Sequence, residues 1–241
     1  MSESATGVID EKVVIITGAS HGIGAGLVAA YRDAGFKVVA SALSVGPSTD
    51  PNVVNVAGDI SDSKTADLIM SEGVDRFGRL DTLVNNAGAY ISKPFTQYTR
   101  ADFDLMLSTN LAGFFHITQR ALRVMEAQGW RHIVTITATV AEQPVKGVPA
   151  ALASLAKGGL NSVTKALAIE YASRGIRVNA VSPTIIRTHP EASYAGLEAQ
   201  IPLGRIGEIE DVTSAVMYLE SARYVTGEIS HVDGGQSAGH W

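Results

Sequence analysis

Three closely spaced glycines near the N-terminus could hold a phosphate-bearing ligand. Gly18, Gly22 and Gly24 lie in the segment 17–24, which reads Thr-Gly-Ala-Ser-His-Gly-Ile-Gly and follows an apolar, β-branched run. The run predicts a buried strand, and the alanine-rich segment 25–34 predicts a helix after the turn. Glycine lets backbone approach a ligand closely, and the free N–H groups and dipole of a helix start favour an anion, so a diphosphate fits here. A glycine-rich turn without a ligand is the alternative interpretation.

Asparagines recur where other elements are predicted to begin or end. Segment 82–88, Thr-Leu-Val-Asn-Asn-Ala-Gly, predicts a strand that ends in a turn. Segment 108–111, Ser-Thr-Asn-Leu, starts a predicted long helix, and segment 179–183, Asn-Ala-Val-Ser-Pro, closes another predicted strand. Nearer the C-terminus stand Pro-Leu-Gly-Arg, Val-Thr-Gly-Glu and His-Val-Asp-Gly-Gly, at 202–205, 225–228 and 231–235.

In this order and combination, the motifs resemble those of the classical short-chain dehydrogenase/reductase family. The resemblance extends from about residue 12 to residue 236. It implies an NAD(P)-binding oxidoreductase that forms a homo-oligomer, either a tetramer or a dimer, and acts on a small molecule.

The resemblance also implies which residues hold the cofactor. In the family the glycine turn holds the pyrophosphate, an acidic residue after the third strand meets the adenine, an Asn-Ala-Gly turn walls the nucleoside, and a Pro-Gly segment holds the carboxamide. The residues expected around the cofactor are Gly18, Ser20, His21, Gly22, Ile23, Gly24, Ser41, Asp59, Ile60, Asn86, Ala87, Gly88, Lys157, Pro183, Ile186 and Thr188. Thr184 replaces the family's glycine and predicts a shifted backbone there.

The end of the second predicted strand bears on the choice between NAD and NADP. An acidic residue there binds the ribose 2′-OH, whereas a basic one accepts the 2′-phosphate. The segment 39–44, Val-Ala-Ser-Ala-Leu-Ser, offers neither. No carboxylate would repel a phosphate, and Ser41, Ser44 and His21 could hydrogen-bond one, so the sequence favours NADP(H) over NAD(H). For His21, an exposed turn residue without a role is the alternative.

Catalysis by the family requires four groups. Hydride transfer to a carbonyl leaves charge on oxygen, which must be stabilised and protonated. The family uses an asparagine that orders a helix and a water, a serine that holds the oxygen, a tyrosine that donates the proton and a lysine that lowers the tyrosine pKa. Asn110 and Lys157 match the asparagine and the lysine, but Ala138 stands at the serine position and Ala153 at the tyrosine position.

A neighbouring hydroxyl could replace the missing serine, but none could replace the missing tyrosine. Thr137 and Thr139 flank Ala138, so a shift of one residue would restore a hydroxyl there. Ala153 has no such neighbour, because Ser154 points about 100° away around the helix. Four loop residues could reach the site, with a solvated loop residue as the alternative for each: Tyr90, Glu142, His189 and Tyr194. Alternatively, the substrate could be a quinone or an imine, which takes the hydride and is then protonated by water, so that no acidic side chain is needed.

The sequence therefore predicts an NADP-dependent oxidoreductase with an atypical proton donor, acting on a small carbonyl, quinone or imine. The two alanines leave two other hypotheses open: a non-catalytic nucleotide-binding sensor or structural subunit, and an inactivated variant of an ordinary reductase. Lys157 could also be an ordinary helix lysine. A small-residue packing face made by Ala153, Ala156, Gly158 and Gly159 is a structural interpretation of the same segment.

The elements that must position these residues alternate between strands and helices. Strands are predicted at 12–16, 37–42, 53–57, 82–84, 132–136, 177–182 and 228–232. This order predicts an α/β, Rossmann-like, doubly wound fold, with a seven-stranded parallel sheet covered by helices on both faces. Residues 11–241 form one predicted domain after a flexible tail at 1–10. Segment 46–51 is too rich in breakers for a helix, so that crossover is predicted as a loop.

Composition limits the partners. The chain has 241 residues, 46% of them hydrophobic, enough for one well-packed domain. A net charge of −5 argues against nucleic acid, and no apolar run approaches the roughly 18 residues of a membrane span. The absence of cysteine suits a cytoplasmic protein. The six histidines lack zinc-site spacing, so no metal is expected.

Overall fold

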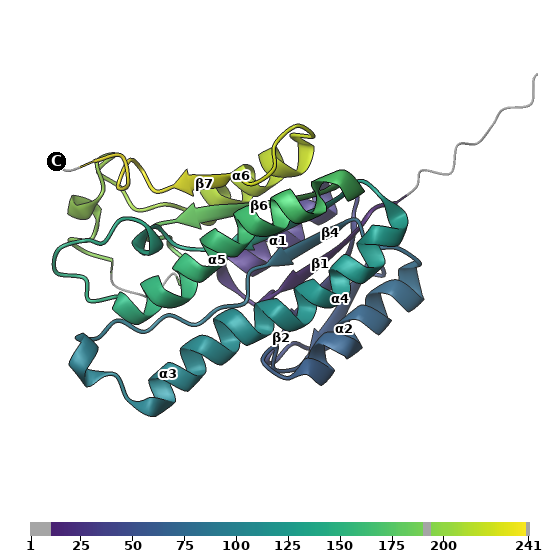
Figure 1. Cartoon of the computed structure of the whole chain (residues 1–241), viewed down its shortest axis with the longest axis horizontal. Helices are drawn as coiled ribbons and strands as arrows, with labels where there is room; N and C mark the ends of the chain where they lie inside the picture. Colours follow the sequence, from purple (N-terminus) through teal and green to yellow (C-terminus); the bar gives the residue numbers. More distant parts are fainter. Residues whose placement is uncertain (1–10, 190–193, 240–241) are drawn as a thin grey trace, which may run out of the picture.

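The computed structural model describes residues 11–189 and 194–239, and within these ranges seven strands form one parallel sheet (Figure 1). The strands are β1 (Val13–Thr17), β2 (Lys37–Ala42), β3 (Val53–Ala57), β4 (Thr82–Asn85), β5 (Arg131–Ile136), β6 (Ile176–Pro183) and β7 (Ile229–Val232). Their order is β3-β2-β1-β4-β5-β6-β7. The predicted single-domain, doubly wound sheet is confirmed, and each predicted strand matches within one residue at either end. The predicted tail, 1–10, lies outside the described residues.

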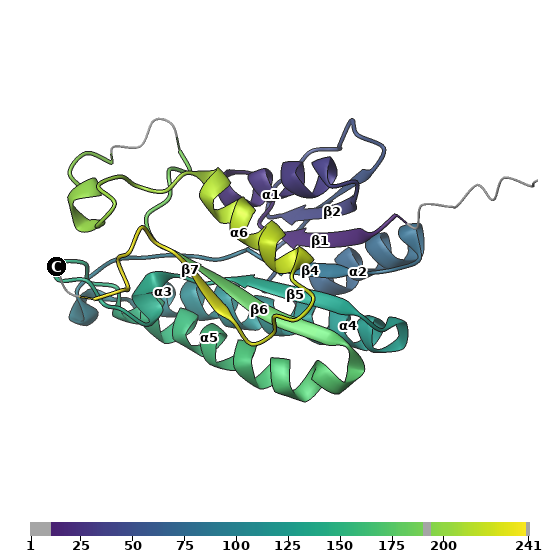
Figure 2. The same ribbon diagram turned by 90° about the horizontal axis from the view of Figure 1, so that it is seen from above.

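Helices cover both faces of the sheet (Figure 2). Helices α1 (Gly22–Asp33) and α6 (Ile209–Ser221) lie on one face. Helices α2 (Ser63–Phe77), α4 (Gly113–Gln128) and α5 (Ala151–Tyr171) lie on the other. Because side chains alternate along a strand, β1 supplies both faces. Ile16 packs with α1 and α6, whereas its neighbour Ile15 packs with the core under α2 and α4.

The crossover from β2 to β3 contains no helix, as predicted. Ser48 and Asp50 instead form a tight turn, in which the Asp50 carboxylate accepts the N–H of Asn52 at 2.8 Å. Arg32 of α1 donates to the same carboxylate at 2.8 Å and ties the loop to the domain. In the part of the chain that the structure describes, one face of the sheet therefore carries two helices and the other carries three.

The prediction that a long helix starts at Ser108 was wrong. Helix α3 (Arg100–Leu107) starts eight residues earlier, where the side chain of Thr99 and that of Asp102 form a reciprocal capping box. The π-helical turn η2 (Ser108–Ala112) then joins α3 to α4. Asn110 thus lies inside a continuous helical segment, in the kind of π-turn that is frequent at functional sites.

The described helices are all too short or too polar to cross a bilayer.

Candidate functional site

The carboxyl ends of β1 and β4 form a crevice. After β1 the chain runs outward to β2, whereas after β4 it runs to β5 on the other side, so the connections diverge between these neighbours. Gly18, with φ at +66°, lies directly against the turn that follows β4. A Cβ added there would lie 2.8 Å from the Cα of Ala87, so only glycine fits.

Thr17 and Asn86 tie the two strand ends together. The amide of Asn86 donates to the carbonyl oxygens of Thr17 and Gly18, at 2.9 and 3.0 Å. The hydroxyl oxygen of Thr17 accepts the N–H groups of Asn86 and Ala87, at 3.1 and 3.0 Å. Sequence reasoning missed this role of Thr17, because only the pairing of β1 with β4 brings the two segments together.

The glycine turn leads into α1 with free backbone donors. Gly24 packs so closely that an added Cβ would lie 2.1 Å from the carbonyl oxygen of Gly18. Helix α1 starts at Gly22, three residues before the predicted start, and the side chain of His21 does not cap it. The first N–H groups of the helix, including that of Ile23, are therefore available to an anion.

The segment after β6 returns over this turn. A Cβ at Gly22 would lie 3.1 Å from the Cβ of Thr188. The imidazole of His189 stacks on that of His21, with centroids 5.5 Å apart, and Ser20 lies 3.0 Å from His21 Nδ1. The exposed hydroxyls and imidazoles thus gather beside the start of α1.

The residues that are predicted to lie near the adenosine differ in their exposure to solvent. Ser41 is buried at 2% exposure, whereas Ser44 beyond the strand is exposed. Asp59 is exposed and accepts the N–H of Ser61 at 2.9 Å. Ile60 is buried against Gly113, where an added Cβ would lie 2.8 Å from the Ile60 side chain.

Lys157 and Asn110 meet at Gly88. The ammonium of Lys157 is buried and donates to the carbonyl oxygen of Ile136 at 2.9 Å, and burial lowers the pKa of Lys157 to about 8. The amide of Asn110 donates to the carbonyls of Ala89 and Met106, which leaves its Oδ1 buried without a partner. A Cβ at Gly88 would lie 2.8 Å from that Oδ1 and 3.0 Å from Lys157 Nζ.

This arrangement fits a sugar hydroxyl. A hydroxyl can accept from the ammonium of Lys157 and donate to the unpartnered oxygen of Asn110. A buried polar atom without a partner is costly unless a ligand or water satisfies it. The residues present therefore fit the ribose of a nicotinamide dinucleotide. Within the described residues no group of acidic or histidine side chains could hold a metal ion.

The two threonines beside Ala138 are oriented toward β6. The hydroxyl of Thr137 donates to the carbonyl of Val181 at 3.3 Å, and that of Thr139 donates to the carbonyl of Ser182 at 3.4 Å. Both side chains are buried, whereas Ala138 between them is partly exposed. Since side chains alternate along extended backbone, the methyl group of Ala138 points away from both hydroxyls.

Ala153 lies in an apolar environment one helical turn before Lys157. It is fully buried and belongs to a cluster with Met106, Ala150 and Leu152. The hydroxyl of Ser154 donates to the carbonyl of Val140 at 2.6 Å and so anchors the loop that precedes α5. No hydroxyl occupies the position of Ala153.

The four loop residues considered as proton donors have distinct surroundings. Tyr90 is 54% exposed, and partial burial raises its pKa. Glu142 pairs with Nε2 of His231 at 2.6 Å. The hydroxyl of Tyr194 accepts the N–H groups of Thr188 and His189; although desolvation opposes the shift, these bonds lower the pKa of Tyr194. His189 stacks on His21 as described above.

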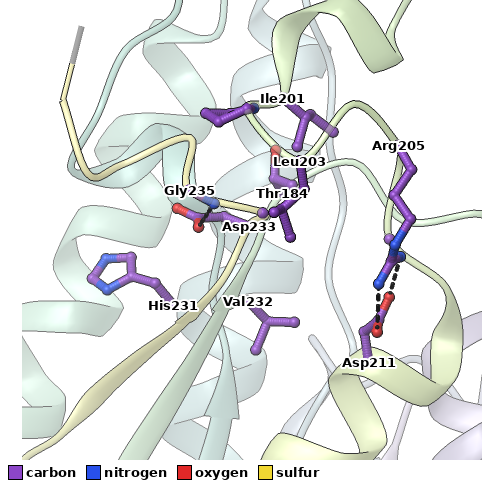
Figure 3. A pocket seen from close by; sticks show the side chains of 12 residues that line it. Thr184, Ile201, Leu203, Arg205, Asp211, His231, Val232, Asp233 and Gly235 are labelled. Carbon is purple, nitrogen blue, oxygen red and sulfur yellow. Dashed lines mark hydrogen bonds and ion pairs between the residues drawn. The ribbon is translucent and has the colours of Figure 1, made fainter. Parts of the chain in front are cut away.

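Thr184 lines a cavity at the end of β6 (Figure 3). Its N–H donates to the carbonyl of Val232 at 3.2 Å and its hydroxyl donates to Gln236. Thr184 does not adopt the left-handed conformation, which among the described non-glycine residues occurs at Trp130 alone. The cavity has a volume of about 480 Å³, and Ile201 and Leu203 form its apolar wall.

The apolar residues after Pro183 divide between core and surface. Pro183, Ile186 and Ile201 are buried, whereas Leu203 is 69% exposed. Ile186 belongs to the core under α1 and α6. These apolar residues therefore do not form one continuous surface over the crevice.

A parallel sheet with a glycine turn at the crevice between β1 and β4 defines a Rossmann-type dinucleotide-binding protein. The model of the enoyl-(acyl carrier protein) reductase family matches residues 18–237. The chain therefore belongs to the short-chain dehydrogenase/reductase family of NAD(P)-dependent oxidoreductases.

Relatives cover almost the whole chain. The 3alpha-hydroxysteroid dehydrogenase of Mediterraneibacter gnavus is 35% identical over 94% of this chain and 97% of its own length. The 3-oxoacyl-[acyl-carrier-protein] reductase FabG of Thermotoga maritima is 33% identical over 94% and 98%. Among solved structures, 3-ketoacyl-(acyl-carrier-protein) reductase from Brucella melitensis complexed with NADH has a TM-score of 0.89 at 31% identity and covers 95% of this chain and 99% of its own. ElxO with NADP bound has a TM-score of 0.88 at 28% identity, with 95% and 100% coverage.

Proposed function

We propose that the protein is an NADP(H)-dependent oxidoreductase that transfers hydride to a small carbonyl, quinone or imine without a tyrosine as proton donor. The observation that carries this proposal is the buried ammonium of Lys157 beside the unpartnered Oδ1 of Asn110. A protein that does not use these groups gains nothing from burying an ammonium without a carboxylate.

Each part of the crevice has a role in this proposal. The backbone N–H groups at the start of α1 bind the pyrophosphate, and Gly18 and Ala87 enclose the nucleoside side. Lys157 and Asn110 hold the ribose and fix the orientation of the ring above it. A reduced nicotinamide supplies the hydride when bound. Because Ala138 and Ala153 offer no hydroxyl, water or a loop residue delivers the proton to the substrate.

One structural neighbour supports the proposal that the cofactor can bind to a protein in which a tyrosine hydroxyl has been removed. A Tyr-to-Phe variant of ElxO, 28% identical to this chain with a TM-score of 0.87, has NADPH bound. In that protein the loss of one phenol leaves NADPH bound. The same separation of binding from proton delivery is proposed for this chain.

Titration with NADPH and NADH, followed by nicotinamide fluorescence, tests the proposal first. We expect micromolar binding with a preference for NADPH, and oxidation of NADPH by at least one member of a panel of aldehydes, quinones and imines. Lys157→Ala should abolish both, whereas Lys165→Ala, an exposed lysine on the same helix, should change neither. Binding of neither cofactor, or an unaffected Lys157→Ala variant, would refute the proposal.

A second candidate is a non-catalytic nucleotide-binding protein. The apolar enclosure of Ala153 favours it, because that environment excludes a proton donor at the family's position. This candidate predicts tight NADPH binding with no turnover of any acceptor in the panel. It also predicts that cofactor binding changes the thermal stability or the assembly of the protein.

A further inference from the structure

The opposite end of the sheet holds a second concave site. The amino ends of β4, β5 and β6 lie there, at the far end of these strands from the cofactor crevice. A cavity of about 520 Å³ opens among them and is bordered by α6. Its charged lining has five cations and two carboxylates: Lys12, Arg79, Arg131, Arg177 and Arg223 against Asp81 and Glu220. In a chain with a net charge of −5, this is a local excess of positive charge.

Both carboxylates are already engaged by protein groups. Arg79 donates to both oxygens of Asp81 at 2.8 Å, and Arg131 lies 3.4 Å from the same carboxylate. Glu220 accepts from Nδ1 of His132 at 2.9 Å. It also receives the hydroxyls of Thr82 and Tyr31, at 3.0 and 3.4 Å, and Lys12 lies 4.0 Å away.

Among the described residues, Arg177 and Arg223 form no ion pair with a carboxylate. Arg177 donates to the carbonyl oxygens of Leu219, Glu220 and Val225, which fix its guanidinium without cancelling its charge. Arg223 is exposed and makes no ion pair or hydrogen bond with another described residue. The site therefore offers an anion one guanidinium that is fixed by carbonyl groups and one that is exposed.

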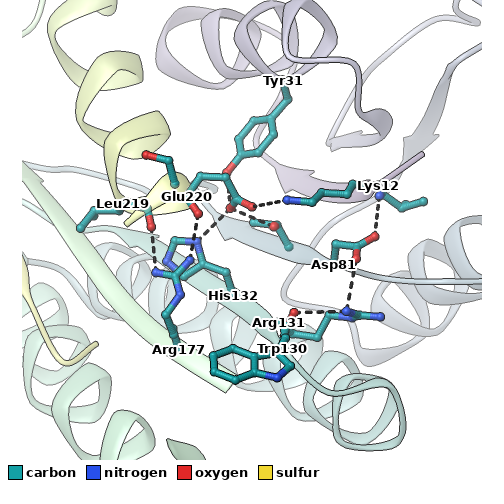
Figure 4. Close-up of polar contacts among 12 residues, drawn as sticks. Lys12, Tyr31, Asp81, Trp130, Arg131, His132, Arg177, Leu219 and Glu220 are labelled. Atoms are coloured by element: carbon teal, nitrogen blue, oxygen red, sulfur yellow. Dashed lines mark hydrogen bonds and ion pairs between the residues drawn. The ribbon is translucent and has the colours of Figure 1, made fainter. Parts of the chain in front are cut away.

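Two exposed aromatic rings border the same arginines. Trp130 is 76% exposed, and Tyr224 is fully exposed. Figure 4 shows Arg177 beside the His132–Glu220 pair, Arg131 directed to Asp81, and Trp130 next to these two arginines. An adjoining cavity of about 670 Å³ is also lined by Trp130, Arg177, Arg223 and Tyr224. These four residues therefore form a ridge between this cavity and the one of about 520 Å³.

The backbone at Trp130 is held in an unfavourable conformation. Its φ is +48°, in the left-handed region that costs a non-glycine residue about 1–2 kcal/mol. The neighbouring turn enforces this, because Arg131 donates its N–H to the carbonyl of Gly175 at 3.0 Å. A Cβ on Gly175 would lie 3.0 Å from the backbone nitrogen of Trp130. Such conformations cluster at functional sites, where the side chain must face a set direction.

We propose that this site binds a planar aromatic anion, such as an aryl carboxylate or aryl sulfonate. The aromatic ring stacks on Trp130 or Tyr224, and the anionic group binds the guanidinium groups of Arg223 and Arg177. This site is independent of the proposed cofactor site, and its occupant changes no covalent bond.

Calorimetric titration of the full chain with 2-naphthalenesulfonate tests this inference. We expect one saturable site per chain, with an affinity that saturating NADPH does not change. Arg223→Ala and Trp130→Gly should each weaken binding at least tenfold. Glycine suits the φ of residue 130, so the second variant keeps the fold. Arg100→Ala, an exposed arginine on α3, should bind the probe like the unmodified chain.

Three outcomes would overturn the inference. The first is the absence of saturable binding. The second is an affinity of Arg223→Ala and Trp130→Gly for the probe that equals the affinity of the unmodified chain. The third is displacement of the probe by NADPH, which would place it in the cofactor crevice instead.

Discussion

Burial of the Lys157 ammonium costs free energy of folding. It has no carboxylate partner among the described residues, and a single backbone carbonyl accepts from it. Desolvation disfavours the charged form and lowers the pKa of Lys157 from 10.5 to about 8. At neutral pH the folded protein therefore carries a cost that a cofactor hydroxyl would partly offset.

Replacing Lys157 by an uncharged residue should increase the stability of the protein and remove its ability to bind the cofactor. Lys157→Met should raise the free energy of unfolding at pH 7 by up to about 3 kcal/mol, since one pKa unit corresponds to about 1.4 kcal/mol. Between the folded pKa near 8 and the unfolded value of 10.5 the unfolded state binds more protons, so the stability of the unmodified chain rises and the difference shrinks toward pH 10. Urea unfolding from pH 7 to 10 measures this.

The same variant should lose NADPH binding. Lys165→Met, which changes an exposed lysine of α5, serves as the control and should leave both properties unchanged. A destabilised Lys157→Met protein at pH 7 would contradict the assignment of the buried ammonium as a functional group.

The exposed Leu43, directly after β2, tests the choice of cofactor. Leu43→Asp should weaken NADPH binding about tenfold, because a carboxylate there repels a 2′-phosphate, while NADH binding changes less. Leu43→Asn keeps the size without the charge and should bind NADPH like the unmodified chain. Leu43 is 76% exposed, so neither change disturbs the core. Equal losses for both cofactors in fluorescence titrations would refute the preference for NADP(H).

At the scale of elements, the sequence predicted strands better than the surroundings of the site. Buried parallel strands are short β-branched runs bounded by turn residues, and such runs are read directly from neighbouring residues. The start of α3 was not predicted, although Thr99 and Asp102 carry the pattern of a capping box. The apolar packing around Ala153 depends on segments distant in sequence, including Met106, so local patterns could not predict it.

That packing decides what the family's tyrosine would do in this chain. Ala153 is fully buried, so Ala153→Tyr must displace its neighbours and should cost about 1–3 kcal/mol of stability. We expect the double variant Ala138→Ser, Ala153→Tyr to gain no carbonyl reduction. Ala151→Tyr, at an exposed position of the same helix, is the control and should keep the stability of the parent. Robust turnover by a stable double variant would mean that the chain is an inactivated ordinary reductase.

At the scale of the whole molecule, a buried polar cluster joins the neighbouring strands β4, β5 and β6 to α1 and α6. Burial lowers the pKa of His132, and the bonds from His132 and Thr82 lower that of Glu220 although desolvation opposes them. Asn179 donates to Nε2 of His132, so the neutral ring donates from Nδ1 to Glu220. Tyr31, Lys12 and Arg177 are the other ionisable groups that face this pair.

This cluster predicts a loss of stability in mild acid. Both folded pKa values lie below the ordinary ones, so the unfolded state takes up protons first as pH falls, below about 6.5 for histidine and about 4.5 for glutamate. The contribution of the cluster to the free energy of unfolding is therefore complete above about pH 6.5, and it is lost as the pH falls to the pKa values of the folded state. Urea unfolding between pH 8 and 5 should show this decline. His132→Gln should flatten it, whereas His116→Gln should not.

The outer surface of α5 is the candidate surface for self-association. Exposed residues recur at helical spacing along it: Leu155, Gly159, Ser162, Ala166 and Ile169. Leu155 is 58% and Ile169 83% exposed, and Phe115 on the adjacent α4 is 56% exposed. Ala153 and Ala156 are buried within the chain, so the expected small-residue face is divided, and Gly159 belongs to this outer stripe.

We propose that this stripe pairs with itself across a two-fold axis in a homo-oligomer, because an apolar helical seam with a small residue lets two helices approach closely. Ile169→Asp would place two carboxylates in that seam and should halve the molar mass measured by light scattering after size exclusion. Leu68→Asp, at an exposed leucine of α2, should leave the mass unchanged. If the unmodified chain is a monomer at micromolar concentration, or if Ile169→Asp keeps the parental mass, copies do not associate through this face, and any tetramer must use another.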